Sequence, residues 1–203
     1  MDLKSTYNKI AQDWFTDHDT STQANPSIDK FASFLKEGDA VLDVGCGPGL
    51  KAKYLNSIGF KITGIDFSEE MIAIAKKNSP SSDFEVKDIT KPLGFTEKFD
   101  GIFAHAVLLH IPKQEIKSVL QNLSAVLNSG GYLYVSVKEL QAGNPQEEIV
   151  KESDYGYEYE RFFSYYTLPE IKEYLEDSNF TVVFENLDTS RNASWVKVIA
   201  KKT

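Results

Sequence analysis

The sequence has few residues of the kinds that form disulfides or bind soft metals. Its 203 residues include one cysteine, Cys46, and three histidines. A single cysteine excludes an internal disulfide, and so few thiols and imidazoles predict no zinc-type metal cluster. Cys46 stands between two glycines, which favours a small residue beside a ligand over a catalytic nucleophile.

Long apolar runs and clusters of basic residues are also lacking. No stretch approaches the roughly 20 apolar residues that a membrane span needs, and residues 1–5 lack the basic and then apolar pattern of a secretory signal. The formal net charge is −8, whereas nucleic-acid binding draws on clustered Lys and Arg. We therefore expect a cytoplasmic protein with neither a membrane nor a nucleic acid as partner.

What the chain does have is enough apolar material for one sizeable domain. Its composition is 41% hydrophobic and 12% aromatic, which is ample for a core at this length. From residue 39 onward, strand and helix patterns alternate, and this predicts a parallel sheet covered by helices on both faces. No internal repeat or second domain is indicated, so we expect a single domain over residues 1–203.

The most informative stretch is 41–50, Val-Leu-Asp-Val-Gly-Cys-Gly-Pro-Gly-Leu. It predicts a buried strand, a tight turn and a helix start, with glycines that permit positive φ and close approach of a ligand. A dinucleotide fingerprint, Gly-x-Gly-x-x-Gly, has its third glycine one residue later, and Pro48 removes an N–H from the turn. A ligand without phosphates fits this loop better, and a nicotinamide or flavin site is the alternative.

The pattern acid-x-Gly-x-Gly-x-Gly, met by Asp43, Gly45, Gly47 and Gly49, resembles the first motif of the class I methyltransferases that depend on S-adenosylmethionine (SAM). The resemblance implies SAM as cofactor, S-adenosylhomocysteine (SAH) as product and no metal. It also implies a Rossmann-like, doubly wound α/β fold. Its seven-stranded sheet would be mostly parallel, with a C-terminal antiparallel hairpin and helices on both faces.

Acidic residues end or follow three successive predicted strands. Asp66 comes about 20 residues after the glycine loop, where an acid can accept hydrogen bonds from ribose hydroxyls; an exposed turn is the alternative. The resemblance implies that Asp88 accepts a hydrogen bond from the adenine amino group and that Ile89 covers the ring, while a turn cap is the alternative for Asp88. Further cofactor-binding residues implied by the resemblance are Tyr7, Cys46, Phe67, Met71, Ala104 and His105.

Residues 1–39 are predicted to form an N-terminal helical cap. An apolar stripe at helical spacing runs from Tyr7 to Phe15, and packing on the domain is enough to explain it. The opening Tyr-x-x-Ile-Ala at 7–11 resembles that of many small-molecule methyltransferases, in which this helix closes over the cofactor. The polar run at 17–23 predicts a mobile loop.

Residues 138–167 are predicted to form an aromatic lid or substrate loop. Residues 155–166 hold seven aromatic side chains in twelve positions, which offer apolar area, polar tips and attraction for cations. The run Arg-Phe-Phe-x-Tyr-Tyr at 161–166 resembles an element near the substrate side of a bacterial group of small-molecule (type 11/12/25-like) methyltransferases. The substrate-binding candidates are Trp14, Arg161, Phe162, Tyr165 and Tyr166.

Methyl transfer from a sulfonium is an in-line displacement, and orientation alone can supply on the order of 7–11 kcal/mol. A hydroxyl or protonated amine acceptor also needs a base, for which histidine has a suitable pKa. His110 and His105 are the catalytic candidates, and a structural role is the alternative for each.

We therefore predict a monomer or homodimer that transfers a methyl group from SAM to a small-molecule acceptor. A protein or peptide methyltransferase, a SAM-binding protein without catalysis and a nicotinamide oxidoreductase are the alternatives.

Overall fold

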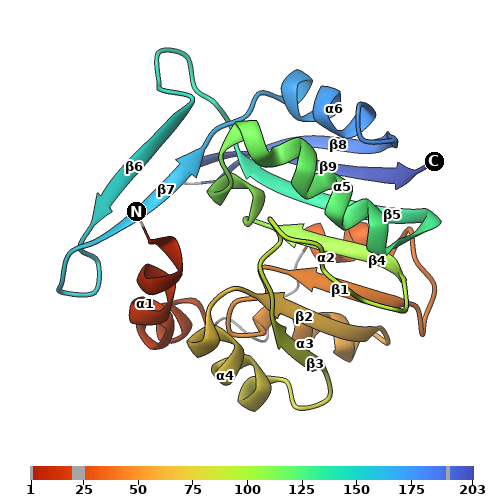
Figure 1. The fold of residues 1–203 in the computed structure, drawn as a ribbon, viewed down its shortest axis with the longest axis horizontal. Helices are drawn as coiled ribbons and strands as arrows, with labels where there is room; N and C mark the ends of the chain where they lie inside the picture. The colour runs from red at the N-terminus through yellow and green to blue at the C-terminus, as the bar shows by residue number, and fades with distance from the viewer. Residues whose placement is uncertain (1, 20–25, 191–192) are drawn as a thin grey trace.

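The computed structural model describes residues 2–19, 26–190 and 193–203. Its main feature is a sheet in which seven described strands follow the order β3-β2-β1-β4-β5-β9-β8. Neighbouring strands from β3 to β5 are parallel, whereas β9 is antiparallel to both β5 and β8 (Figure 1). The predicted fold is thereby confirmed. The strands are β1 (Ala40–Val44), β2 (Lys61–Asp66), β3 (Asp83–Val86), β4 (Phe99–His105), β5 (Leu127–Lys138), β8 (Phe180–Ser190) and β9 (Ala193–Lys202).

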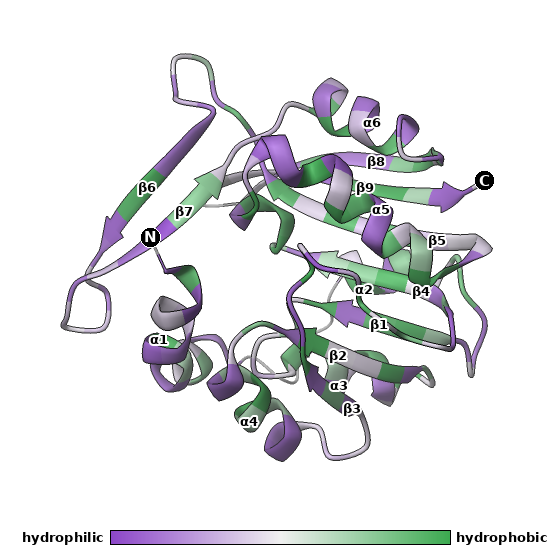
Figure 2. Ribbon diagram, viewed as in Figure 1, coloured by the Kyte–Doolittle hydropathy of each residue, from purple (hydrophilic) through white to green (hydrophobic). Residues whose placement is uncertain are grey.

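Helices cover both faces of this sheet because each presents an apolar stripe to it. Buried side chains of α2 (Pro26–Ala32), α3 (Leu50–Ser57) and α4 (Glu69–Asn78) share one core with the sheet. Those of α5 (Ile116–Val126) and α6 (Leu168–Glu176) share the other. Figure 2 shows apolar strands between helices whose outer faces are polar. In the described residues no helix combines the length and apolar character that crossing a bilayer requires.

Helix α1 (Leu3–His18) lies apart from these layers and bridges α4 and the strand β7 (Tyr159–Ser164) (Figure 1). Asn8 anchors it to the start of α4, because its side-chain oxygen accepts a hydrogen bond from Ser68 Oγ at 2.6 Å and its amide donates to Glu69 at 3.1 Å. Lys4 also pairs with Glu69. Residues 20–23 of the predicted polar loop lie outside the described residues.

The segment expected to be an aromatic loop contains an antiparallel hairpin of β6 (Glu147–Glu152) and β7 (Tyr159–Ser164). The expected loop thus contains two strands, which sequence analysis missed because aromatic density hid a period of two. Along β7 the side chains of Tyr159, Arg161 and Phe163 share one face. Charged residues dominate β6, which therefore lacks the apolar alternation that marks a strand. The hairpin stands next to α1, on the left of Figure 1.

Candidate active site

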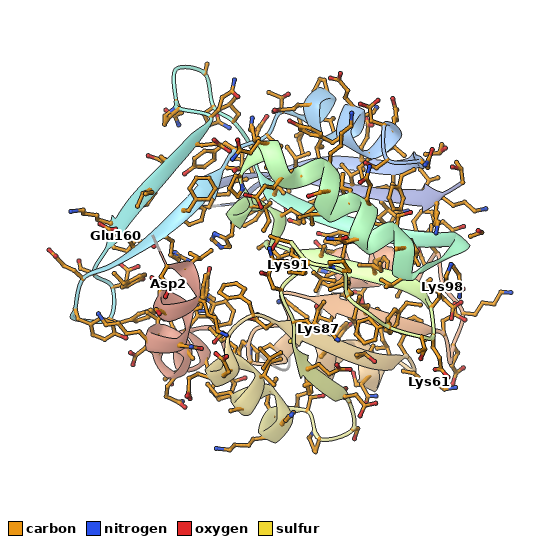
Figure 3. All side chains as sticks on the ribbon, in the orientation of Figure 1. Asp2, Lys61, Lys87, Lys91, Lys98 and Glu160 are labelled. Atoms are coloured by element: carbon orange, nitrogen blue, oxygen red, sulfur yellow. The ribbon has the colours of Figure 1, made fainter. Side chains whose placement is uncertain are left out.

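A cavity of about 470 Å³ lies where the carboxyl ends of β1, β2 and β4 meet α1 and the hairpin. Ligands of open α/β sheets bind at this edge, and the volume is in the range of small-molecule sites. The loops after these three strands supply Gly47, Phe67 and Ala106, while α1 supplies Tyr7 and Trp14. Figure 3 labels Lys61 and Lys98 at the opposite end of the sheet, away from this cavity.

The three glycines after β1 have different structural roles, although all have positive φ. A Cβ on Gly45 would lie 2.6 Å from Val107 Cγ2, so this glycine permits close packing of the loop after β4. A Cβ on Gly49 would lie 3.2 Å from Ala75 Cα. A Cβ on Gly47 would meet nothing closer than 4.0 Å and would stand in the cavity. The backbone at Gly47 is therefore open to a bound molecule.

Asp66 joins the end of β2 to the glycine loop. Its carboxylate accepts hydrogen bonds from Gly47 N at 3.0 Å and Ser68 N at 2.9 Å. Only 8% of the residue is exposed, and burial raises its pKa to about 6. Each carboxylate oxygen has a second lone pair, so Asp66 keeps capacity to accept hydrogen bonds from a ligand in the cavity.

Asp43 lies inside β1 and is also buried, and burial raises its pKa to about 7. Its Oδ2 has no hydrogen-bond partner among the described residues. Lys51, at the start of α3, lines the cavity and has its pKa lowered by burial. Asp43 and Lys51 thus place two ionisable side chains beneath the glycine loop.

His110 is held in one tautomer by a hydrogen-bonded chain. Its Nδ1 lies 2.7 Å from the carbonyl oxygen of Phe162, which can only accept, so Nδ1 carries the proton. Its Nε2 therefore accepts from the Tyr7 hydroxyl, also at 2.7 Å. Burial, with Arg161 and Lys138 nearby, lowers the pKa of His110 to about 3. Both nitrogens of the neutral ring are engaged.

His105 ends β4 and belongs to a row of nearly parallel rings. Its centroid lies 5.8 Å from that of Phe103 and 6.1 Å from that of Trp195, with interplanar angles of 9° and 11°. Nδ1 of His105 has no hydrogen-bond partner among the described residues, and burial lowers the pKa of the ring to about 3. The site therefore offers two neutral imidazoles.

The hairpin adds a cation that is already paired. Arg161 donates from Nε and Nη2 to the carboxylate of Glu152, so the pair is bidentate. Side-chain exposures of 19% and 18% show that both partners are shielded from water. Phe163 packs beside them, with the ammonium of Lys138 3.8 Å from its ring centroid.

The structure brings most predicted site residues together, but not all of them. Asp88 is exposed and accepts hydrogen bonds from the amide and hydroxyl of Thr90, at 2.8 and 2.7 Å. Tyr166 is fully buried in the core. Predicted residues that line the cavity are Tyr7, Trp14, Gly45, Cys46, Gly47, Asp66, Phe67, Met71, His105, His110 and Arg161. Those outside its lining are Asp43, Gly49, Asp88, Ile89, Ala104, Phe162, Tyr165 and Tyr166.

Several lining residues were missed by sequence reasoning. Phe163 stands where Phe162 was expected, because successive side chains of a strand point to opposite faces. Lys138 and Trp195 face each other across β5 and β9; a strand assignment that extended to residue 138 would have placed Lys138 at the sheet edge. Within the described part of the chain, no group of three or more His, Cys, Asp or Glu could hold a metal ion.

Strand order, glycine loop and cavity together define the architecture of the class I methyltransferases. The chain belongs to the family described as a methyltransferase domain, whose model matches residues 16–185. The resemblance stated from the sequence is thereby confirmed.

Two curated relatives match in part. The ubiquinone biosynthesis O-methyltransferase of Coxiella burnetii is 30% identical over 139 residues, covering 64% of this chain and 58% of that protein. Phosphoethanolamine N-methyltransferase 1 of Triticum aestivum is 31% identical over 151 residues, covering 72% and 29%. The match thus spans less than two thirds of either relative's own length.

Solved structures agree on the fold over most of the chain. A SAM-dependent methyltransferase from Methanosarcina mazei has a TM-score of 0.77 at 22% identity, covering 89% of this chain and 98% of that one. The 1,6-didemethyltoxoflavin-N1-methyltransferase of Burkholderia thailandensis, solved with its substrate and SAH, has a TM-score of 0.75 at 21% identity, covering 98% and 85%.

Proposed function

We propose that this protein transfers a methyl group from SAM to a small-molecule acceptor by in-line displacement. The observation that carries the proposal is the open backbone at Gly47 beside Asp66, at one end of the cavity. A ligand with a ribose and no phosphate suits this end, because Asp66 can accept from hydroxyls and Pro48 leaves the turn short of one N–H donor. The family match to residues 16–185 supports it.

The residues that would hold SAM follow from where they stand. Asp66 would accept from the ribose, Gly45 and Gly47 would let the ligand approach the backbone, and Met71 and Phe67 offer apolar contact along the wall. SAM when bound supplies a methyl group on a positively charged sulfur. Asp88 accepts both hydrogen bonds from Thr90 at Oδ1 and lies outside the cavity lining, and its role toward the adenine stays a prediction.

His110 is better suited to orienting a group than to taking a proton. Its Nε2 already accepts from Tyr7, and a pKa lowered to about 3 makes it a weak base near neutral pH. The hydrogen-bonded chain of Phe162, His110 and Tyr7 fixes the phenolic oxygen of Tyr7 at the cavity wall, where this oxygen can accept a hydrogen bond from the methyl-accepting substrate. His105, whose pKa burial also lowers to about 3, is an equally weak base and keeps the role of candidate orienting group.

The contacts between α1 and the hairpin support a small acceptor over a protein or peptide. Helix α1 is tied to the hairpin by Tyr157, whose hydroxyl donates to Asp13, and by Lys9, which donates to the carbonyl of Glu158. A peptide would have to part these contacts. A monomeric or homodimeric state and a cytoplasmic location stay predictions.

The test is SAH formation from SAM with a panel of phenols, amines and carboxylic acids. We expect turnover with at least one class. Gly47→Ala should abolish it, because its Cβ would enter the cofactor space, whereas Gly143→Ala should not. Gly143 also has a positive φ, +85° against +51° at Gly47, and no described atom lies within 4 Å of a Cβ there, so this variant controls for the strain of a positive φ. SAM binding without turnover across the panel would favour the non-catalytic alternative, and equal effects of the two variants would refute the assigned cofactor end.

A further inference from the structure

We infer that Lys138 binds the carboxylate of the methyl acceptor, and that the acceptor is a planar aromatic carboxylate. The inference rests on the proposed function, since it assigns the part of the cavity that SAM would leave free. It goes further by naming a residue and a chemical class for the acceptor.

Lys138 is one of two lysines that line the cavity, and neither lysine has a carboxylate within ion-pair distance among the described residues. It is the last residue of β5, it is half-buried, and it lines the cavity. Among the described residues its ammonium has neither a hydrogen-bond acceptor nor a carboxylate within ion-pair distance, and its one close contact is the face of Phe163 at 3.8 Å. An ammonium group has three donors, so Lys138 has donors to offer a ligand.

The charged side chains near Lys138 already have partners of their own. Arg161 is neutralised by its bidentate pair with Glu152. Glu148 accepts a hydrogen bond from the Tyr165 hydroxyl at 2.8 Å and does not line the cavity. A ligand anion would therefore meet Lys138 as the unpaired cation on the wall at this end of the cavity, while Glu148 and Glu152 act on Lys138 from outside the lining.

The other charged groups that line the cavity lie elsewhere along its wall, and Lys51 stands at the glycine-loop end, near Asp43. Asp17 is an exposed residue near the end of α1, 3.7 Å from His18. Asp66 belongs to the glycine-loop end, where it accepts from backbone amides. Neither lies within ion-pair distance of Lys138, so the acceptor end keeps its unpaired cation.

Burial and the like charge of Arg161 lower the pKa of Lys138. A bound carboxylate would oppose both effects, because an opposite charge within a few ångströms favours the charged form. One unpaired ammonium matches a singly charged carboxylate. A phosphate group carries more charge and draws on several donors, which this end of the cavity does not assemble.

The walls beside Lys138 favour a flat ligand. Trp195 faces Lys138 across β5 and β9, so the two side chains share one face of the sheet. The Trp195 ring is nearly parallel to that of His105, and Phe163 lies under the ammonium. A planar ring can pack along these aromatic faces with its carboxylate at the ammonium. A cationic acceptor is disfavoured, because Lys138 already occupies the face of Phe163.

The test compares anionic ligands with uncharged ones of the same shape. The probes are para-hydroxybenzoate and para-aminobenzoate, each paired with its amide, added to protein saturated with SAH. Trp14 and Trp195 are the two tryptophans of the chain and both line the cavity, so quenching of intrinsic fluorescence reports binding. We expect each benzoate to bind about tenfold or more tightly than its amide, the size of a charge-assisted hydrogen bond.

Variants assign the preference to Lys138. Lys138→Met should abolish the preference for the anion, and Lys138→Arg should retain most of it. Lys151→Met is the matched control, because Lys151 lies on the adjacent hairpin with 77% of its side chain exposed, and it should behave as wild type. The inference is overturned if neither benzoate binds, if the amides bind as tightly, or if Lys138→Met keeps the preference.

Calorimetry with SAH alone separates this inference from the proposed function. Failure to bind SAH would remove the proposed function, and the comparison of benzoates with amides would then be made on the protein without SAH. Binding of SAH without any preference for the anion would overturn the Lys138 inference and leave the proposed function standing.

Discussion

Replacing Asp66 by Asn should weaken SAM binding and, near neutral pH, stabilise the fold. Folding carries the carboxylate into a site where burial raises its pKa from 3.8 to about 6. Two pKa units correspond to about 3 kcal/mol of destabilisation of the ionised form. Asn removes this cost but replaces one acceptor oxygen by a donor, so one backbone hydrogen bond worth about 1–2 kcal/mol is lost. The net gain is about 1–2 kcal/mol at about pH 7.

The sign of this prediction follows from how the stability of the wild type depends on pH. The folded protein binds more protons at Asp66 than the unfolded chain between the ordinary pKa of 3.8 and about 6, so the stability of the wild type falls as pH rises through this window. Asn does not titrate. The advantage of Asp66→Asn should therefore be present above about pH 6 and lost as pH falls toward about 4.

Thermal unfolding of both proteins across this pH range measures the effect. A gain of 1–2 kcal/mol raises the melting temperature by a few degrees in a chain of this size, while calorimetry should show SAM affinity reduced about tenfold. Asp100→Asn is the control, since Asp100 accepts from Ala40 N and from Asn128 far from the cavity; it should leave SAM affinity unchanged. An advantage of Asp66→Asn that grows toward acid pH would refute the reasoning.

Three further predictions concern single contacts. Gly45→Ala should cost about 2 kcal/mol or more in urea unfolding, because its Cβ would strike Val107; Gly94→Ala, with a similar φ and free space, isolates the clash, and equal losses would contradict it. His110 should stay neutral in the folded protein well below its ordinary pKa, as its lowered pKa of about 3 implies, and a ring titration seen by NMR between about pH 6 and 7 would disprove this. Asn8→Ala should loosen α1, seen as faster proteolysis within it and several-fold weaker SAM binding, whereas Gln12→Ala on the exposed face should not; identical behaviour would argue against the anchoring role of Asn8.

The fold and the geometry of the glycine loop were predictable because their signals are local. Strand, glycine turn and helix start follow one another within residues 41–50, and alternation of strand and helix patterns implies the parallel sheet. The requirement for glycine at Gly47 comes from φ and from the open space beside it. Its backbone conformation could be inferred from neighbouring residues alone.

The acceptor end depends on contacts between distant segments, which no local pattern encodes. Phe163 lines the cavity in place of the expected Phe162 because of the register of β6 and β7. The charged residues of β6 hid that strand pairing from sequence analysis. His110 is fixed by a carbonyl 52 positions away in the sequence. That Lys138 has no ion-pair partner among the described residues, while Arg161 pairs with Glu152, follows only from the folded arrangement.

The most direct test of the central claim is calorimetric titration of the purified protein with SAM and SAH, with NAD as control. The geometry at Gly47 and Asp66 predicts saturable binding of both SAM and SAH, and no heat with NAD. Heat with NAD and none with SAM would contradict the proposed function and return the glycine loop to a dinucleotide site.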